Sequence, residues 1–340
     1  MLGSLFLFSL LLLSRTISGQ NPCPDPEEIT PCTCSFDGAT LEVLVDCSAV
    51  AGEDQIFSAF NNINWFTRLT EFRLTDNAAV QNLLEGVFGE VTFKRVHVDA
   101  TSLALLEPLV LLGFKDVLEE VRVLDSRLGS FGFVLLTALS HLAVLDLEGN
   151  ALTVLPVLRN PSLQFLNVEM NQIATVEGGW SVPNLKQLQM GRNPIVDFPS
   201  GVFEGLESLE QFSCFSCNLG PTLRAGFLAS QSPSLVSVDL RFNDIVNLEP
   251  GAITGLAAHT NLDLRSNKIE ELTEEIFRPM VEAVAAGSGF IDLVGNPVKC
   301  VCSMAWLVLN PDFLASVDGR CDDGLAFQDL DPLIFQELCL

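Results

Sequence analysis

The chain has 340 residues, of which 48% are hydrophobic, and its 43 acidic against 18 basic side chains give a formal net charge of -25. Nucleic acids, anionic membranes and sulfated polysaccharides carry negative charge themselves, so this composition disfavours them as partners. A basic or neutral partner is compatible with it.

The first 19 residues have the pattern of a signal peptide. An apolar run from Leu5 to Leu13 is followed by small residues at Ser18 and Gly19. The run is shorter than the roughly 20 residues that span a bilayer and has the length of the apolar part of a secretory signal. No apolar tail stands at the other end, so we expect a secreted, extracellular protein without a membrane span.

Residues 20–52 form a cysteine-rich segment with Cys23, Cys32, Cys34 and Cys47. Disulfides persist in oxidising compartments, and each stabilises a small domain by about 2–4 kcal/mol. We expect a disulfide-stapled N-terminal cap. Four cysteines allow three pairings, and the sequence alone leaves the choice open.

Residues 53–295 contain about ten copies of one sequence pattern, which we call the repeat line; an example is LAVLDLEGNAL at residues 142–152. Strand side chains alternate between two faces, so the leucines form a core and the residues between them face solvent. The line starts at Leu69, Phe93, Leu118, Leu142, Leu163, Leu185, Leu209, Leu235, His259 and Ser288. An asparagine follows at Asn77, Asn150, Asn171, Asn193, Asn243, Asn267 and Asn296, with Thr101, Ser126 and Cys217 in the other three repeats.

Starts 21 to 29 residues apart have the period of the leucine-rich repeat. The pattern predicts an α/β leucine-rich repeat solenoid with a curved parallel sheet on the concave face, irregular turns and short helices on the convex face, and disulfide-stapled caps. An antiparallel sandwich would not place one asparagine at one offset. The asparagine amide can both donate and accept hydrogen bonds to turn backbone that lacks ladder partners.

Cys214 and Cys217 stand apart from the terminal clusters, at an inward position and at the asparagine position of one repeat. We expect them to be buried free thiols that act as small apolar fillers. A redox Cys-x-x-Cys pair is the less favoured alternative, because such a pair needs an exposed thiolate at a helix start.

Residues 296–340 contain a second cluster, Cys300, Cys302, Cys321 and Cys339, and predict a C-terminal cap. Zinc binding through the Cys-x-Cys pairs is disfavoured at both ends, because the usual two-residue gap and supporting histidines are missing. An open repeat array needs such caps to cover its terminal leucines.

Catalytic chemistry has little support in the sequence. The three histidines, His97, His141 and His259, belong to different repeats, and the common nucleophile, phosphate-loop and dinucleotide motifs are absent. Glu270, Glu271, Glu274 and Glu275 lack the spacing of a calcium loop. We therefore expect neither an enzyme nor a bound metal or cofactor.

The outward strand positions form the surface where function is expected. Acidic residues gather in the middle, and apolar side chains occur where solvent would favour polar ones, which is typical of a binding site. The candidate ligand-binding residues are Asp146, Glu148, Phe165, Glu169, Met170, Phe215, Asp239, Arg241, Phe242 and Arg265. In this hypothesis Phe215 and Phe242 are apolar anchors, and Arg241 and Arg265 pair with carboxylates of a protein partner. The alternative is that these side chains lie on their neighbours without a specific role.

The cysteine clusters, together with Asn296-Pro297 and Trp306-Leu307, resemble the caps of extracellular leucine-rich repeat proteins. The resemblance implies bridges Cys23–Cys34, Cys32–Cys47, Cys300–Cys321 and Cys302–Cys339. The convex segment at residues 199–206 is similar to repeats of that class in which a phenylalanine packs under the strands.

A narrower resemblance covers residues 23–123, with Cys34-Ser35-Phe36, residues 65–69 and the irregular line at residues 93–99. This region is similar to arthropod proteins that resemble the non-catalytic leucine-rich repeat subunit of shrimp luciferase. It implies an accessory, protein-binding role and no catalytic residues. The alternative is a soluble innate-immune type receptor for microbial or lipid ligands, marked by an apolar pocket under residues 105–112. The sequence leaves open whether the concave faces pair into a homodimer.

Overall fold

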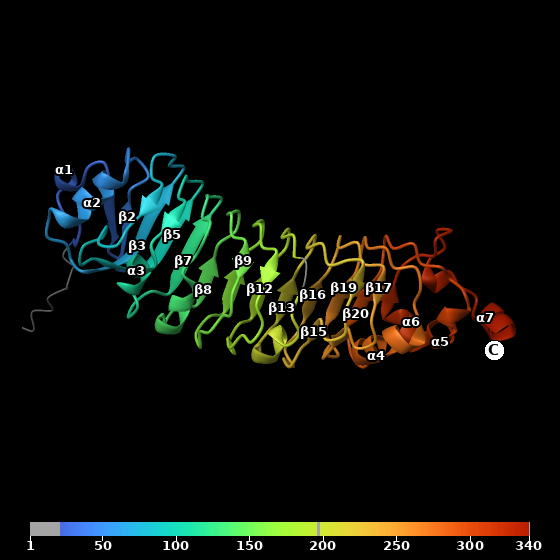
Figure 1. The fold of residues 1–340 in the computed structure, drawn as a ribbon. Helices are drawn as coiled ribbons and strands as arrows, with labels where there is room; N and C mark the ends of the chain where they lie inside the picture. The colour runs from blue at the N-terminus through green and yellow to red at the C-terminus, as the bar shows by residue number, and fades with distance from the viewer. Residues whose placement is uncertain (1–20, 196–197, 340) are drawn as a thin grey trace, which may run out of the picture.

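The structure is a computed structural model that describes residues 21–195 and 198–339. The expected signal peptide therefore lies outside the described residues. Figure 1 shows a long solenoid in which the main strands follow one another along the axis and the cap helices lie at its two ends.

One sheet of 13 strands runs through the molecule, and all neighbouring strands are parallel except β1 and β2. Its strands, in spatial order, are β1 (Thr33–Asp37), β2 (Glu42–Asp46), β3 (Arg68–Thr75), β5 (Thr92–Asp99), β7 (Glu120–Leu124), β8 (Val144–Asp146), β10 (Phe165–Asn167), β12 (Gln187–Gln189), β13 (Gln211–Ser213), β16 (Ser237–Asp239), β19 (Asn261–Asp263), β20 (Phe290–Asp292) and β21 (Val317–Asp318). The repeats supply the ten strands from β3 to β20, as the sequence predicts. The caps add β1, β2 and β21, which carry no repeat signature.

The other side of each repeat consists of turns, two-residue strands and short helices. The small strands are β4 (Asn82–Leu83), β6 (Leu105–Leu106), β9 (Val154–Leu155), β11 (Thr175–Val176), β14 (Thr222–Leu223), β15 (Leu228–Ala229), β17 (Asn247–Leu248) and β18 (Ile253–Thr254). The helices are α1 (Pro26–Ile29), α2 (Glu53–Asn61), α3 (Pro108–Leu112), α4 (Glu274–Ala285), α5 (Ala305–Val308), α6 (Pro311–Ala315) and α7 (Pro332–Cys339), with 3-10 turns η1 (Phe133–Ala138), η2 (Val202–Gly205), η3 (Cys302–Met304) and η4 (Phe327–Asp329).

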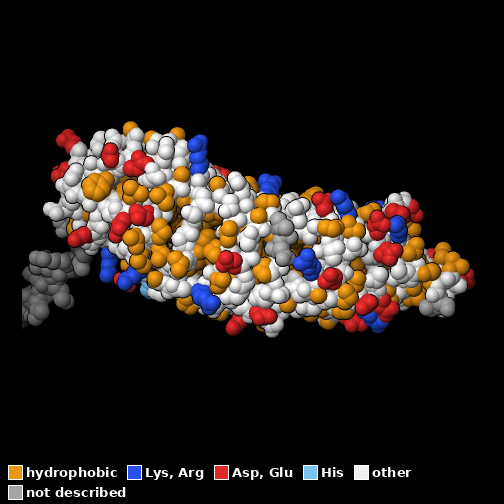
Figure 2. All heavy atoms as spheres, viewed as in Figure 1, with side chains coloured by type: hydrophobic (Ala, Val, Ile, Leu, Met, Phe, Trp, Pro, Cys, Tyr) orange, Lys and Arg blue, Asp and Glu red, His pale blue; other side chains and the backbone are white. Residues whose placement is uncertain are grey.

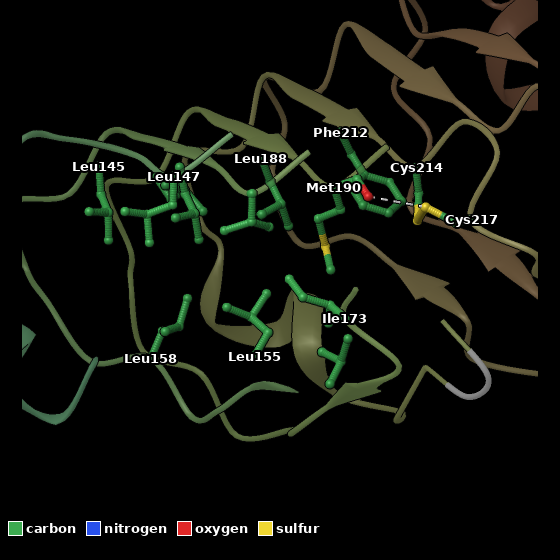
Figure 3. Packing of buried hydrophobic residues seen from close by; sticks show 14 of the residues in the cluster. Leu145, Leu147, Leu155, Leu158, Ile173, Leu188, Met190, Phe212, Cys214 and Cys217 are labelled. Carbon is green, nitrogen blue, oxygen red and sulfur yellow. Dashed lines mark hydrogen bonds between the residues drawn. A yellow bond between two sulfur atoms is a disulfide. The ribbon is translucent and has the colours of Figure 1, made fainter. Parts of the chain in front are cut away.

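The core is a continuous apolar layer between the two sides. Figure 3 shows Leu145, Leu147 and Leu188 pointing inward from the strands toward Leu155 and Leu158 of the opposite side. All five are fully buried. Each repeat packs mainly on its neighbours, so the core grows with the number of repeats instead of closing on itself.

Aromatic rings replace leucines in two stretches of this core. Five rings cluster in the first repeats with centroids 4.7 to 6.3 Å apart, namely Phe60, Phe72, Phe88, Phe93 and Phe114. Four more cluster near the middle at 4.9 to 6.5 Å, namely Phe198, Phe203, Phe212 and Phe227. Such pairs add about 0.5–1.5 kcal/mol each beyond their burial.

The asparagines form a hydrogen-bonded ladder along the turn that follows the strands. Asn171 donates to the carbonyls of Leu147 at 2.8 Å and Val168 at 3.1 Å, and accepts from the Leu152 N–H at 2.9 Å. Each ladder amide thus joins two successive repeats. Where serine and threonine replace asparagine, the Thr101 and Ser126 hydroxyls bond each other at 2.8 Å.

The residue before each ladder position adopts a left-handed backbone. This holds in ten successive repeats, at Asp76, Ala100, Asp125, Gly149, Met170, Arg192, Ser216, Phe242, Ser266 and Gly295. Only two of the ten are glycines, although this conformation costs other residues about 1–2 kcal/mol. The ladder hydrogen bonds evidently hold the turn against that cost.

The four cap disulfides pair as the family resemblance implies, Cys23–Cys34 and Cys32–Cys47 in one cap and Cys300–Cys321 and Cys302–Cys339 in the other. The expectation that Cys214 and Cys217 are free thiols is wrong, because the two form a fifth disulfide. The turn between the strand and the ladder position brings their Cα atoms to 5.5 Å, within the range that a disulfide spans. Both cysteines are buried, as expected.

Candidate functional site: the concave face

We use "concave face" for the outward side of the 13-stranded sheet. Strand register aligns its central side chains into one column, Asp46, Arg73, His97, Arg122, Asp146, Asn167, Gln189, Ser213, Asp239, Asp263, Asp292 and Asp318. The ten repeat residues of this column are those that the sequence pattern assigns to the outward face. Adjacent members are about 4.8 Å apart, the spacing of paired strands.

Ion pairs cover the N-terminal part of this face. Arg73 lies 2.6 Å from Glu71, and Arg95 reaches Glu71 at 3.3 Å and Glu42 at 3.1 Å. Arg122 pairs with Asp146 at 2.9 Å. These arginines are therefore neutralised by carboxylates of the same strand or of a neighbouring strand.

A second series of ion pairs covers the C-terminal part. Arg241 lies between Asp239 at 2.7 Å and Asp263 at 3.2 Å, and Arg265 lies between Asp263 at 2.5 Å and Asp292 at 3.2 Å. The hydrogen bonds that Arg241 donates to Asp239 and Arg265 donates to Asp263 raise the pKa of both guanidinium groups. In the structure Arg241 and Arg265 thus pair with carboxylates of their own chain, whereas the sequence hypothesis assigns them to a partner.

The carboxylates of the central part have fewer cationic partners. Glu148 accepts a hydrogen bond from Asn167 Nδ2 at 3.0 Å, and Ser213 Oγ lies 3.5 Å from Glu169 Oε1. Burial and the charge of Glu148 raise the pKa of Glu169. Burial also raises the pKa of Asp146, although hydrogen bonding and Arg122 oppose the shift.

Phe165 and Phe215 are half-buried on the concave face. Phe165 lies beside Gln187 in the strand register. The Phe215 ring leans over Gly191, because a Cβ placed on that glycine would lie 2.3 Å from a ring carbon. The Arg192 guanidinium covers the same ring at 5.5 Å from its centroid, a cation–π distance.

Met170 and Phe242 lie at the edge of the sheet, in the left-handed turn position. Their exposed fractions are 39% and 55%. They belong to repeats three strands apart in the sheet, a separation of about 14 Å. Met170 and Phe242 therefore lie too far apart to contact each other.

Gln187, Gln189 and Gln211 are functional candidates that the sequence hypothesis omitted. Gln187 pairs in register with Gln211 on the next strand, and Gln189 lies on the same strand as Gln187. Gln187 and Gln189 are half-buried and Gln211 is exposed. The sequence contained a signal for them. These repeats have uncharged amides at outward strand positions, whereas the repeats on either side more often have charged residues at the equivalent positions.

The N-terminal repeats carry the surface where the alternative hypothesis expects a lipid pocket. Figure 2 shows hydrophobic side chains gathered over this third of the molecule, while acidic groups are spread along its length. A hollow of about 280 Å³ lies beside α3. The space beneath it is occupied by Phe88 and Phe114 of the aromatic cluster, which are both buried.

Residues 21–195 and 198–339 contain neither a metal-binding cluster nor a helix suited to crossing a membrane. No group of three or more histidine, cysteine, aspartate or glutamate side chains is arranged there to hold a metal ion. In the same part of the chain, no helix combines the length and apolar character that crossing a membrane requires.

Sequence comparison finds similarity along almost the whole chain to one named protein. The chain is 26% identical to the Oplophorus-luciferin 2-monooxygenase non-catalytic subunit of Oplophorus gracilirostris, over 96% of this chain and 91% of that protein. A shorter match, 32% identical, links 34% of the chain to 19% of the leucine-rich repeat and fibronectin type-III domain-containing protein 4 of Rattus norvegicus. No family model matches the chain.

Solved structures share the fold at low sequence identity. A chain of the octameric complex of Latrophilin 3, Unc5D and FLRT2 superposes with a TM-score of 0.55 and 18% identity, covering 80% of this chain and 83% of that one. A chain of the TLR13–ssRNA13 complex gives 0.56 and 20%, covering 84% of this chain and 42% of that one. With the sheet and the cap disulfides, these likenesses establish a leucine-rich repeat solenoid with cysteine caps.

Proposed function

We propose that this leucine-rich repeat protein is a non-enzymatic, extracellular accessory protein that holds a protein partner on its concave face. The observation that carries the proposal is the unbroken column of outward side chains. The strand register aligns this column across twelve strands, over about 53 Å. A standard protein interface buries about 800 Å² of each partner, and a surface of this length can hold one.

The comparison with Oplophorus gracilirostris supports the accessory role. The similar protein is named a non-catalytic subunit, and the similarity extends over 91% of its length. A subunit without catalysis contributes by binding. Five disulfides in the described residues support an oxidising, extracellular location.

The test is a paired capture from the native secretion. The wild-type chain, a concave variant, Phe165→Ala with Phe215→Ala, and a convex control, Val134→Ala, are immobilised side by side. Val134 is 79% exposed on η1. We expect one stoichiometric protein to be retained by the wild type and the control and lost from the concave variant.

Two results would contradict the proposal. One is a partner that all three immobilised chains retain equally. The other is turnover of a substrate by the purified chain alone. Light scattering of the purified wild type separates partner binding from self-association, because a homodimer through the concave face should dissociate in the Phe165→Ala, Phe215→Ala variant.

A further inference from the structure

The charges of the concave face divide it into three parts. On the N-terminal part the arginines pair with Glu42, Glu71 and Asp146, and on the C-terminal part Arg241 and Arg265 pair with Asp239, Asp263 and Asp292. These flanks largely satisfy their own charges. The charged side chains of these flanks offer a partner little, because each new ion pair with the partner would have to break an existing one.

The middle strands β10, β12 and β13 differ, because their outward residues are uncharged. These residues are Phe165, Asn167, Gln187, Gln189, Gln211 and Ser213. The three glutamine carboxamides make no hydrogen bond to any described residue, and each offers two donors and an acceptor. Gln187 and Gln189 lie on β12 and Gln211 on the adjacent β13, about 4.8 Å away, so an extended chain laid across these strands can hydrogen-bond its own backbone groups to successive carboxamides.

Glu148 and Glu169 border this uncharged region. Neither has a cation within salt-bridge distance among the described residues, and their contacts are with the neutral groups of Asn167 and Ser213. Their mutual repulsion contributes to the raised pKa of Glu169. A cation supplied from outside would relieve that repulsion, and Phe165 offers an apolar surface for its aliphatic stem.

We infer that strands β10, β12 and β13 are the docking position for an extended, cationic segment of a partner protein, whose lysine or arginine side chains pair with Glu148 and Glu169 while its backbone bonds the three glutamines. This inference rests on the proposed function and specifies it. The charge of -25 attracts such a segment from a distance, and the uncharged region with its two free carboxylates determines where the segment binds.

The test uses the full chain and two synthetic probes, a peptide of alternating lysine and serine and a matched peptide of alternating glutamate and serine. Titration calorimetry at about 150 mM salt limits long-range attraction. We expect the lysine peptide to bind and the glutamate peptide not to bind. Glu148→Gln with Glu169→Gln should weaken the lysine peptide at least about tenfold, and Gln187→Ala with Gln211→Ala at least about threefold.

The matched control is Glu207→Gln with Glu275→Gln, which removes the same charge from exposed sites outside the concave face. We expect less than about a twofold effect. An equal loss in both glutamate pairs, or no binding of the lysine peptide, overturns the inference. Binding of a neutral oligosaccharide that depends on the glutamines and ignores Glu148 and Glu169 also overturns it, and assigns the region to a sugar.

The native partner distinguishes this inference from the proposed function. A partner that is lost with Phe165→Ala and Phe215→Ala but retained with Glu148→Gln and Glu169→Gln leaves the concave binding role intact and refutes the cationic segment. Thermal unfolding of each variant confirms that the fold is retained before any binding is compared.

Discussion

Alanine at two neighbouring ladder positions, Asn171 and Asn193, should destabilise the solenoid by different amounts. The Leu147 carbonyl that accepts from Asn171 at 2.8 Å also accepts from Asn150 at 3.1 Å. Another acceptor of Asn171, the Val168 carbonyl, also accepts from Asn193 at 2.8 Å, so Asn171→Ala leaves only the Leu152 N–H without a partner. A buried unpaired group costs about 1–3 kcal/mol, which is the loss we expect at this position.

Asn193 differs, because one of the carbonyls to which it donates has no second donor among the described residues. It donates to the Met190 carbonyl at 2.8 Å and accepts from the Ile173 N–H at 2.9 Å. The next ladder position is Cys217, whose sulfur lies 3.3 Å from the same carbonyl but carries no proton in the disulfide. Asn193→Ala thus leaves two buried groups unpaired, and we expect a loss of about 2–6 kcal/mol.

The measurement is urea unfolding followed by circular dichroism and by tryptophan fluorescence. The two signals must coincide, because a repeat array can unfold in segments. Asn184→Ala is the control, since this exposed amide makes one bond, to the Pro161 carbonyl at 2.7 Å; its effect should stay within about 0.5 kcal/mol. Equal losses at Asn171 and Asn193 would refute the account of the ladder.

A donor restored at the cysteine position provides a second check. In the variant Cys214→Ala with Cys217→Asn, the new amide can reach the Met190 carbonyl, so Asn193→Ala should cost less in that background than in the wild type. The difference between the two backgrounds is the coupling energy of the two positions. A coupling of zero would show that Cys217 does not limit the ladder there.

Three further predictions concern the cysteines, a turn and a carboxylate. Thiol titration of the denatured, unreduced secreted chain should find no free thiol, because all ten cysteines are bridged; two thiols per chain would show that the central bridge is absent. Gly149→Ala should lower stability by about 1–3 kcal/mol, because φ is +68° and the new Cβ would lie 2.3 Å from Asp125 Oδ1, whereas Gly129→Ala has open space and should cost little. Burial and Glu148 raise the pKa of Glu169, so its ionisation weakens the fold as the pH rises; Glu169→Gln should raise the thermal midpoint at about pH 7 and leave it unchanged at about pH 3. A lower midpoint at neutral pH would contradict this.

The sequence predicts the fold well because one period governs it. Leu145 and Leu147 are inward and Asn150 joins the ladder, as strand alternation and amide chemistry require. The left-handed turn before the ladder escaped prediction, because residues such as Met170 and Phe242 do not signal it as glycine would. Its recurrence comes from hydrogen bonds between repeats, which no single repeat reveals.

The candidate site was harder to predict because neighbouring strands decide what each charge does. Arg241 and Arg265 look available in the sequence, yet each pairs with an aspartate two residues before it and with a second aspartate on the next strand, 22 and 27 residues further along the chain. The bridge between Cys214 and Cys217 depends on the path of one turn. The sequence alone could not distinguish carboxylates that form ion pairs from Glu148 and Glu169. These two differ because the neighbouring strands, within the described part of the chain, place no cationic side chain within reach of them.

The two aromatic clusters have a consequence for how such a chain can change in length during evolution. Rings of Phe88 and Phe114, and of Phe198 and Phe227, pack against each other across successive repeats, so a unit gained or lost inside either cluster would separate rings that pack together. The stretch around Leu145 and Leu166 is built from aliphatic side chains in equivalent positions, and a unit can be inserted there without disturbing either cluster. Homologues of different length should therefore differ between the clusters, at the place where the concave face changes from paired to unpaired charge.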